Sequence, residues 1–147
     1  MKTINEINLK LLSRSSNESF ARVAVSAFVA QLDPTIEEIT DIKTAVSEAV
    51  TNCIVHAYEE KLGYIYITVK ILEGGGVLIK IRDTGRGIPD VKQAMEPLYT
   101  TAGGERAGLG FAIMQSFMTT VKVRSTVNKG TAVTMTKQLN PRIKING

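Results

Sequence analysis

The sequence has few of the residues that build covalent or metal-based scaffolds: its 147 residues include one cysteine, one histidine and no tryptophan. The single cysteine, Cys53, excludes an internal disulfide and any zinc cluster that depends on several thiolates. No stretch approaches the roughly 20 consecutive apolar residues that span a bilayer, and residues 1–7 lack the apolar run of a signal peptide. We therefore expect a cytoplasmic protein that makes no contact with a membrane.

Runs of one charge sign are also missing, although the net charge is +4. Lysine and arginine are scattered along the chain, and the densest basic element is the tail Arg142-Ile143-Lys144. No basic helix face alternates with aromatic side chains, which make up only 5% of the residues. The pattern typical of nucleic-acid-binding proteins is therefore absent, and we expect no direct contact with nucleic acid.

What is present is the composition of a single folded domain, residues 1–147. Hydrophobic residues make up 44% of the chain and charged residues 22%, and these are ordinary values for a soluble globular protein. A chain of this length is also large enough to bury a substantial core.

Hydrophobic periodicity predicts helices mainly in the first half of the chain and strands mainly in the second half. The expected helices cover residues 20–32, 35–61 and 111–120, with a short one within 88–101. The expected strands cover residues 4–12, 64–72, 77–82, 121–127 and 131–139. Because helices and strands do not alternate regularly, we expect an α+β fold, a two-layer sandwich. Its mixed, largely antiparallel sheet would carry the helices on one face.

Turn and cap residues set the expected boundaries of these elements. Asp33 and Pro34 predict the start of the long helix, with Asp33 as its N-cap and Pro34 at its first position. Gly63 is expected to end that helix. Residues 102–110 hold four glycines and are expected to form a mobile loop before the last helix.

Three polar residues, Glu48, Asn52 and His56, follow one another at intervals of four and so lie on one face of the long helix. An ordinary solvated face would explain them equally well. Asn52 argues against that explanation, because asparagine is a poor interior helix former whose amide oxygen suits Mg²⁺. Glu48, one turn away, could then act as a base. For His56, packing or a salt bridge is the favoured role.

The segment Asp83-Thr84-Gly85-Arg86-Gly87 directly follows an expected strand. Two glycines in alternate positions permit a sharp turn and leave room for a flat ring against the backbone. A carboxylate at the strand end could accept a hydrogen bond from the exocyclic amine of adenine. A simple tight turn before Pro89 is the competing interpretation.

A second glycine-rich segment, residues 103–110, leads into the last expected helix. The N-terminus of a helix offers free N–H groups and the positive end of a dipole, which favour phosphate. Arg106 could add a charged contact to a terminal phosphate. The segment is not a P-loop, because no Gly-Lys-Ser/Thr follows, and a flexible lid without a ligand is the alternative.

The order of these motifs resembles the GHKL (Bergerat-type) ATP-binding superfamily, which includes gyrase B, Hsp90, MutL and the histidine kinases. The resemblance implies that Asn52 holds Mg²⁺, that Asp83 binds the adenine amine and that Thr131 helps on the adenine side. It places phosphates at Gly108-Leu109-Gly110. The further nucleotide contacts that it implies are Gly85, Gly87, Thr100, Thr101 and Arg106.

Within that superfamily, nearly the whole chain is similar to the anti-sigma F kinases of endospore-forming bacteria. The segments that carry the similarity are residues 17–23, 28–35, 46–52, 97–101 and 127–131. The resemblance implies a homodimer that binds ATP or ADP with Mg²⁺ and holds sigma F away from RNA polymerase. It also implies phosphorylation of a serine on a STAS-domain anti-anti-sigma factor, with Glu48 as the base.

Partner contacts are expected at Arg22 and Glu105, and a dimer seam at Val25 and Phe28. Arg22 interrupts an apolar helix and could anchor an acidic partner, although a solvated arginine is equally compatible with the sequence. Two functional alternatives stay open. One is an anti-sigma B kinase of the stress response, and the other is a nucleotide-gated sigma-binding module without significant kinase activity.

Overall fold

The computed structural model describes residues 2–59, 61–96 and 107–140. The helical elements in chain order are α1 (Ser16–Val29), the 3₁₀ turn η1 (Ala30–Leu32), α2 (Ile36–Asn52), the π-helical turn η2 (Cys53–Ala57), α3 (Val91–Ala94) and α5 (Ala107–Phe117). The strands are β1 (Thr3–Leu12), β2 (Tyr64–Leu72), β3 (Gly76–Asp83), β4 (Thr120–Thr126) and β5 (Gly130–Gln138). In this part of the chain, no helix has the length and apolar character needed to cross a membrane.

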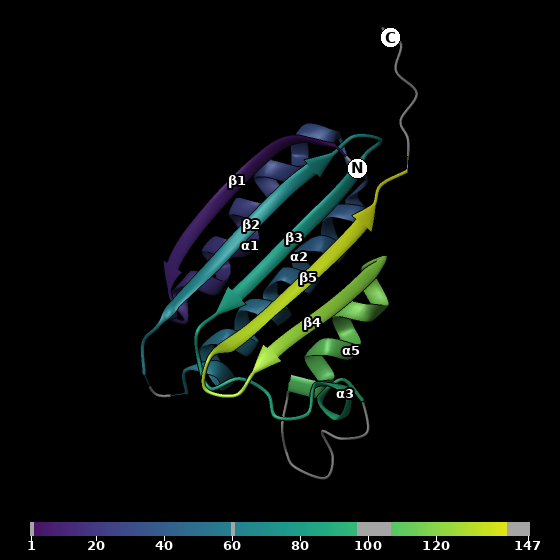
Figure 1. Cartoon of the computed structure of the whole chain (residues 1–147). Coiled ribbons are helices and arrows are strands. Elements are labelled where there is room, and N and C mark those ends of the chain that lie inside the picture. Colours follow the sequence, from purple (N-terminus) through teal and green to yellow (C-terminus); the bar gives the residue numbers. More distant parts are fainter. Residues whose placement is uncertain (1, 60, 97–106, 141–147) are drawn as a thin grey trace, which may run out of the picture.

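The strands form one five-stranded sheet in the order β1-β2-β3-β5-β4. Every neighbouring pair runs antiparallel. Helices α1, α2 and α5 lie together behind this sheet, and no helix of the described residues covers its other face (Figure 1). The expected α+β two-layer sandwich is confirmed, with an antiparallel sheet rather than a mixed one.

Alternation along the strands explains why only one face of the sheet is covered. In β2, Ile65, Ile67 and Val69 are buried, whereas Tyr66 and Thr68 between them are partly exposed. Since successive side chains of a strand point to opposite faces, the β-branched residues face the helices. Each such side chain contributes about 1.5–3 kcal/mol when it is fully buried.

The start of α2 differs from the expectation. Asp33 has a left-handed backbone conformation with φ of 52° and is not the N-cap. The cap is Thr35, whose hydroxyl accepts a hydrogen bond from the backbone N–H of Glu38. The Glu38 carboxylate in turn accepts from the N–H of Thr35 and, through its other oxygen, from that of Asn140. This capping box satisfies free N–H groups that Pro34 alone would leave unpaired.

Two further helix boundaries also differ. The long helix was expected to continue to residue 61 and to end at Gly63, but α2 gives way to η2 at Cys53 and helical structure ends at Ala57. The last helix was expected from residue 111, whereas α5 begins at Ala107. The described residues 107–110 of the predicted mobile loop are therefore helical.

The capping box predicts a measurable stability difference between two helix starts. Thr35→Ala should lower the free energy of unfolding by about 1 kcal/mol, because it removes the acceptor for the Glu38 N–H. Ser15→Ala is the matched control, since the Ser15 side chain makes no capping hydrogen bond at the start of α1. Urea denaturation checks both variants. Equal losses in the two variants would contradict the assignment of Thr35 as the cap.

Candidate functional site

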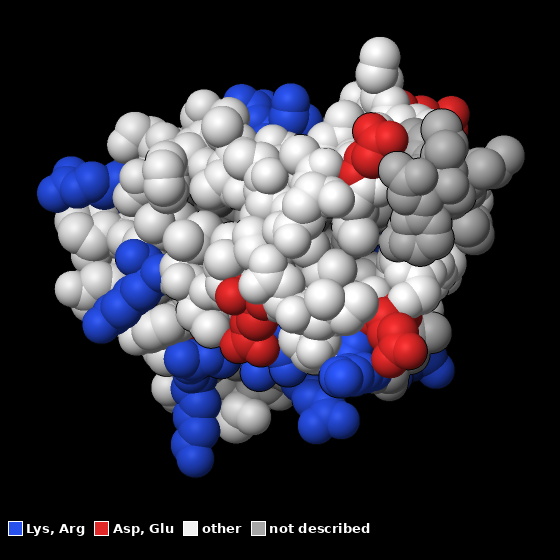
Figure 2. Space-filling view, turned by 90° about the horizontal axis from the view of Figure 1, so that it is seen from above, with Lys and Arg blue, Asp and Glu red and all other residues white. Residues whose placement is uncertain are grey.

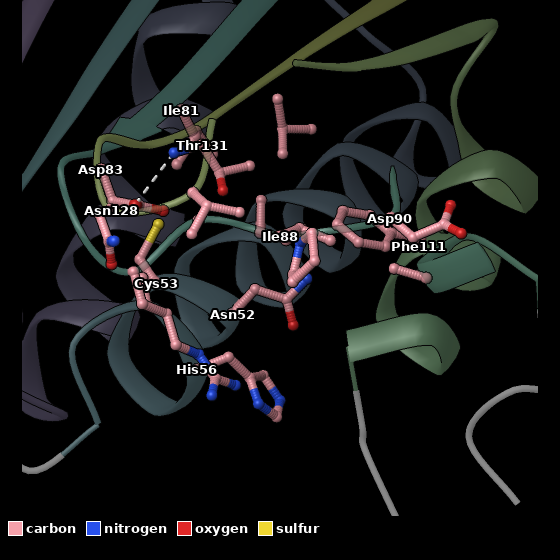
Figure 3. A pocket seen from close by; sticks show the side chains of 18 of the residues that line it. Asn52, Cys53, His56, Ile81, Asp83, Ile88, Asp90, Phe111, Asn128 and Thr131 are labelled. Carbon is pink, nitrogen blue, oxygen red and sulfur yellow. Dashed lines mark hydrogen bonds between the residues drawn. The ribbon is translucent and has the colours of Figure 1, made fainter. Parts of the chain in front are cut away.

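A cavity of about 430 Å³ opens between the end of α2, the segment after β3, and the helices α3 and α5. Its lining includes residues from all of these elements and from the start of β5. Four of the sequence-predicted residues line it together: Asn52, Asp83, Gly87 and Thr131. In Figure 3, Asp83 and Thr131 lie at one end of the cavity and Phe111 at the other. The apolar part of the wall includes Ile81, Ile88, Phe111 and Val133.

Asp83 is a buried carboxylate at the end of β3, only 5% exposed. Its Oδ1 accepts hydrogen bonds from the backbone N–H of Gly85 at 2.9 Å and of Thr131 at 3.2 Å. Burial raises the pKa of Asp83 above its ordinary value of 3.8, and these two hydrogen bonds, with one from the Cys53 thiol, oppose the rise. The carboxylate thus joins β3, β5 and η2 at one end of the cavity.

Cys53 is a site residue for which the sequence predicts no functional role. It is 3% exposed, it lines the cavity, and its thiol donates a hydrogen bond to Asp83. Burial, and then the negative charge of Asp83, raise the pKa of the Cys53 thiol well above its ordinary value, so the thiol keeps its proton. Its position next to Asn52 is the one sequence signal that could have drawn attention to it.

The π-helical turn η2 brings the end of α2 against the turn that follows Asp83. The Ala57 carbonyl accepts a hydrogen bond from the N–H of Arg86 at 3.0 Å, and the Tyr58 hydroxyl accepts from that of Thr84 at 2.8 Å. Single π turns inside helices are rare overall, but where they occur they are often at functional sites. Here the turn couples the helix that carries Asn52 to the strand end that carries Asp83.

The two glycines of this turn are explained by protein packing. A Cβ at Gly85 would lie 2.3 Å from the Ala57 carbonyl oxygen, and one at Gly87 would lie 2.3 Å from that of Thr126. Gly87 also has a positive φ of 75°, which L side chains rarely adopt. Only Gly87 of the two lines the cavity. The space that was expected for a flat ring at Gly85 is therefore filled by the protein's own backbone.

Asn52 and Glu48 meet helix α5 at Gly110. A Cβ at Gly110 would lie 3.2 Å from Oε1 of Glu48 and 3.3 Å from Oδ1 of Asn52. The Nδ2 atom of Asn52 is buried and has no hydrogen-bond partner among the described residues. A buried amide without a partner is costly, so its position beside a cavity is that expected of a ligand contact.

The sequence predicts that His56 and Glu48 share a helix face with Asn52. In the structure they occupy different positions relative to the cavity. His56 lines the cavity and has an interaction of its own within the protein. Glu48 lies outside the described lining and reaches toward α5.

The remaining predicted contacts lie at α5 or outside the described residues. Leu109 is 45% exposed in the first turn of α5, the same turn as Gly108 and Gly110. Residues Thr100, Thr101, Glu105 and Arg106 lie outside the described part of the chain. The Thr131 hydroxyl bonds the Ser125 hydroxyl at 2.7 Å, so the inner end of the cavity is held by an interaction between β4 and β5.

The predicted partner and dimer residues lie on or next to α1. The Nε of Arg22 lies 3.8 Å from Oε2 of Glu18, and the Arg22 side chain is 40% exposed. Val25 is completely buried in the core, so its expected place in a dimer seam is wrong. Phe28 packs partly against the core, whereas Phe20 and Val23 are about half exposed.

Comparisons with known proteins define the class of this fold. Residues 13–137 match the family described as histidine kinase-like ATPase domain. The histidine kinase domain of the blue-light activated kinase EL346 from Erythrobacter litoralis is similar in fold. Its TM-score is 0.58 at 20% identity, over 83% of this chain and 60% of that one. The RsbU and RsbW domains of Rv1364c from Mycobacterium tuberculosis match with a TM-score of 0.69 at 20% identity, over 93% of this chain and 33% of that one.

Sequence relatives narrow the class further. The chain is 59% identical over 140 residues to the anti-sigma F factor of Caldanaerobacter subterraneus, covering 95% of this chain and 97% of the relative. It is 56% identical over 138 residues to that of Clostridium botulinum, with coverage of 92% and 96%. The chain belongs to the anti-sigma F factor family of histidine kinase-like ATPase domains.

The raised pKa of Asp83 predicts how stability depends on pH. The folded state holds the proton of Asp83 more tightly than the unfolded state, so unfolding becomes harder as pH falls toward 3.8. Asp83→Asn removes the buried charge and keeps an acceptor oxygen. The variant should therefore be at least as stable as the parent at pH 7, with an advantage that shrinks toward pH 4. Thermal unfolding across this range checks it, and a constant deficit of the variant at every pH would contradict the account.

Proposed function

We propose that the cavity binds ATP with its adenine ring at Asp83. The aspartate would accept a hydrogen bond from the exocyclic amine, and the apolar wall of Ile81, Ile88 and Val133 would pack against the ring. Guanine presents a carbonyl oxygen where adenine presents the amine. An ionised Asp83 would repel that oxygen, so the site should discriminate strongly against GTP.

The phosphates would then extend from the adenine end toward the first turn of α5. The free N–H groups and dipole of that helix end favour a negative ligand. The orphaned amide of Asn52 lies between the cavity and α5, and its position supports a contact near the phosphates.

The amide oxygen of Asn52 is suited to be one ligand of an Mg²⁺ ion that the phosphates of the nucleotide also coordinate. No cluster of three or more metal-binding side chains exists among the described residues, so the protein would supply one amide oxygen and the phosphates and water the rest. Mg²⁺ is bound in this way in many phosphoryl-transfer sites. The bound ion would neutralise charge on the phosphate groups during transfer.

We also propose that the protein transfers the γ-phosphoryl group to a serine of a protein partner. The serine oxygen would bond to the γ-phosphorus as the bond to the bridging oxygen of ADP breaks, and Glu48 would take the serine proton. Glu48 makes no hydrogen bond of its own in the described structure, which leaves its carboxylate available as a base. The expected substrate is a STAS-domain anti-anti-sigma factor.

The relatives' names supply the observation that carries the regulatory part of the proposal. Proteins 55–59% identical over nearly the whole chain are called anti-sigma F factors, so we propose that this protein binds a sigma factor of the F type. Arg22 on α1 and Glu105 are the proposed contacts. A homodimer is proposed as the working unit, with the exposed Phe20 and Val23 replacing the buried Val25 at its seam.

One observation favours a second candidate function, a nucleotide-gated sigma-binding module without significant kinase activity. Glu48 lies outside the described lining of the cavity, so it would have to be brought to the substrate by partner binding. The two functions differ in whether the phosphoryl group is transferred, and the Glu48 variant below separates them.

Asn52→Ala tests the proposed metal contact. The variant should bind ATP with Mg²⁺ at least about tenfold more weakly, while binding of ATP without Mg²⁺ changes little. Because the buried Nδ2 has no partner to lose, the unfolding temperature should not fall. Calorimetric titration with and without Mg²⁺ measures the effect, and Thr51→Ala on the same helix is the control. Equal affinity of parent and variant for Mg-ATP would count against the metal role.

Glu48→Gln tests the proposed base. Transfer of labelled γ-phosphate to a STAS-domain partner should slow by about 100-fold or more, the usual size of a general-base effect. Nucleotide affinity should stay within about twofold, because the amide keeps the shape of the side chain. Glu37→Gln, an exposed change at the start of α2, serves as the control. Undiminished transfer in Glu48→Gln would exclude Glu48 as the base, and no transfer by the parent protein would favour the gated module.

A further inference from the structure

The face of the sheet that carries no helix is strongly basic. Its outward side chains include six basic residues and one acidic residue, Glu6. The basic residues are Lys10, Lys70, Lys80, Arg82, Lys122 and Arg124. The whole chain has 18 basic and 14 acidic residues, so the remainder of the molecule is nearly balanced in charge. Figure 2 looks along the sheet from above, and blue side chains gather along its lower rim, where the open face lies.

Strand register brings four of these residues into two parallel pairs. Lys80 and Arg82 lie on β3. Lys80 is directly opposite Thr134 of β5, and Arg82 is directly opposite Ala132. On the other side of β5, Thr134 and Ala132 face Lys122 and Arg124 of β4. Strands lie about 4.8 Å apart and same-face residues repeat every ~6.8 Å. The two basic pairs therefore border a low track over β5, about 10 Å wide.

Among the described residues, the basic side chains that border this track have no acidic partner. Glu6 lies at the margin of the face, where its Oε1 is 4.0 Å from Nζ of Lys70. Among the described residues, no ion pair involves Lys80, Lys122 or Arg124. Like charges clustered on one sheet face destabilise a fold. A basic cluster that no acidic side chain of the described residues neutralises indicates an anionic partner outside the protein.

The surroundings of Tyr66 distinguish between kinds of anionic partner. A groove of about 270 Å³ crosses β1, β2 and β3 on this face, with Lys10, Tyr66, Lys80 and Arg82 in its lining. The guanidinium of Arg82 stands 4.2 Å from the centroid of the Tyr66 ring, and the Lys10 ammonium stands 4.2 Å from that of Tyr64. These cations cover the rings, which removes the stacking platform that single-stranded nucleic acid uses.

We propose that the open sheet face is a docking surface for an acidic segment of a partner protein, lying extended along β5 between the two basic pairs. An extended peptide rises about 3.3 Å per residue, so its alternate side chains repeat at the same spacing as the lysines and arginines of β3 and β4. Thr134 and Ala132 are small enough to let its backbone approach the sheet. The helices lie on the opposite face of the sheet (Figure 1). The proposed nucleotide cavity is lined by residues of α2, α3 and α5, so both ligands could bind at once.

A binding assay with a defined probe tests this surface. The probe is a fluorescein-labelled oligoglutamate peptide, and fluorescence anisotropy is read at low salt and at about 0.15 M salt, where the Debye length is ~8 Å. The test variant is Lys80→Glu with Lys122→Glu. The control is Lys43→Glu with Lys61→Glu, which changes the net charge equally at positions off the sheet. The neutral pair Lys80→Gln with Lys122→Gln repeats the test without introducing new charges.

The proposal expects affinity for the peptide to fall at least about tenfold in both sheet variants and less than about twofold in the control. The neutral pair should also unfold at a temperature no lower than the parent, because it relieves repulsion between like charges. An oligothymidylate of equal charge should bind more weakly than the peptide. The proposal is overturned if the control loses as much affinity, if the oligothymidylate binds as tightly as the peptide, or if the parent protein binds neither.

Discussion

The buried carboxylate of Asp83 is the constraint on which the rest of the site depends. Burial at the end of β3 raises its pKa, and hydrogen bonds from the backbone N–H groups of Gly85 and Thr131 and from the thiol of Cys53 oppose that rise. Those donors come from three separate parts of the chain. Burying a charge is costly unless such partners are in place, so the carboxylate fixes how the strand end, β5 and η2 meet. A carboxylate at the wall of an apolar cavity is the kind of acceptor that a purine amine requires.

The backbone around that carboxylate is shaped to fit it. The π-helical turn η2 ends α2 early and lets the Ala57 carbonyl reach the N–H of Arg86. A side chain at Gly85 would collide with that same carbonyl, so the turn after β3 and the end of α2 fit only with glycine there. Asn52 is then held one residue before the π turn, with an amide nitrogen that has no hydrogen-bond partner in the part of the chain that the structure describes. A bound nucleotide and metal ion would supply the partner that the Asn52 amide lacks in the described structure.

Sequence patterns predicted the elements well because alternation and helical periodicity report directly on burial. The α+β class, the five strands and the order of the site motifs all follow from them. The failures have physical causes. Asp33 looked like a cap, but Thr35 with Glu38 forms a better one. Val25 was assigned to a dimer seam because an apolar helix face cannot show which side the sheet covers. The basic residues are scattered in the sequence. They form one surface because alternate residues of β3 and β4 point to the same face of the sheet. Cys53 was missed because helical periodicity shows that it is buried but not that the Asp83 carboxylate lies beside it.

Discrimination between purines tests the central claim most directly, because it depends on the aspartate alone. Calorimetric titration of the protein with ATP and with GTP, both with Mg²⁺, gives the two affinities under the same conditions. The account predicts that ATP binds at least about 100-fold more tightly, the discrimination expected when a buried acceptor loses its donor and meets another acceptor. Equal affinities for ATP and GTP would contradict the assignment of Asp83 as the group that recognises adenine.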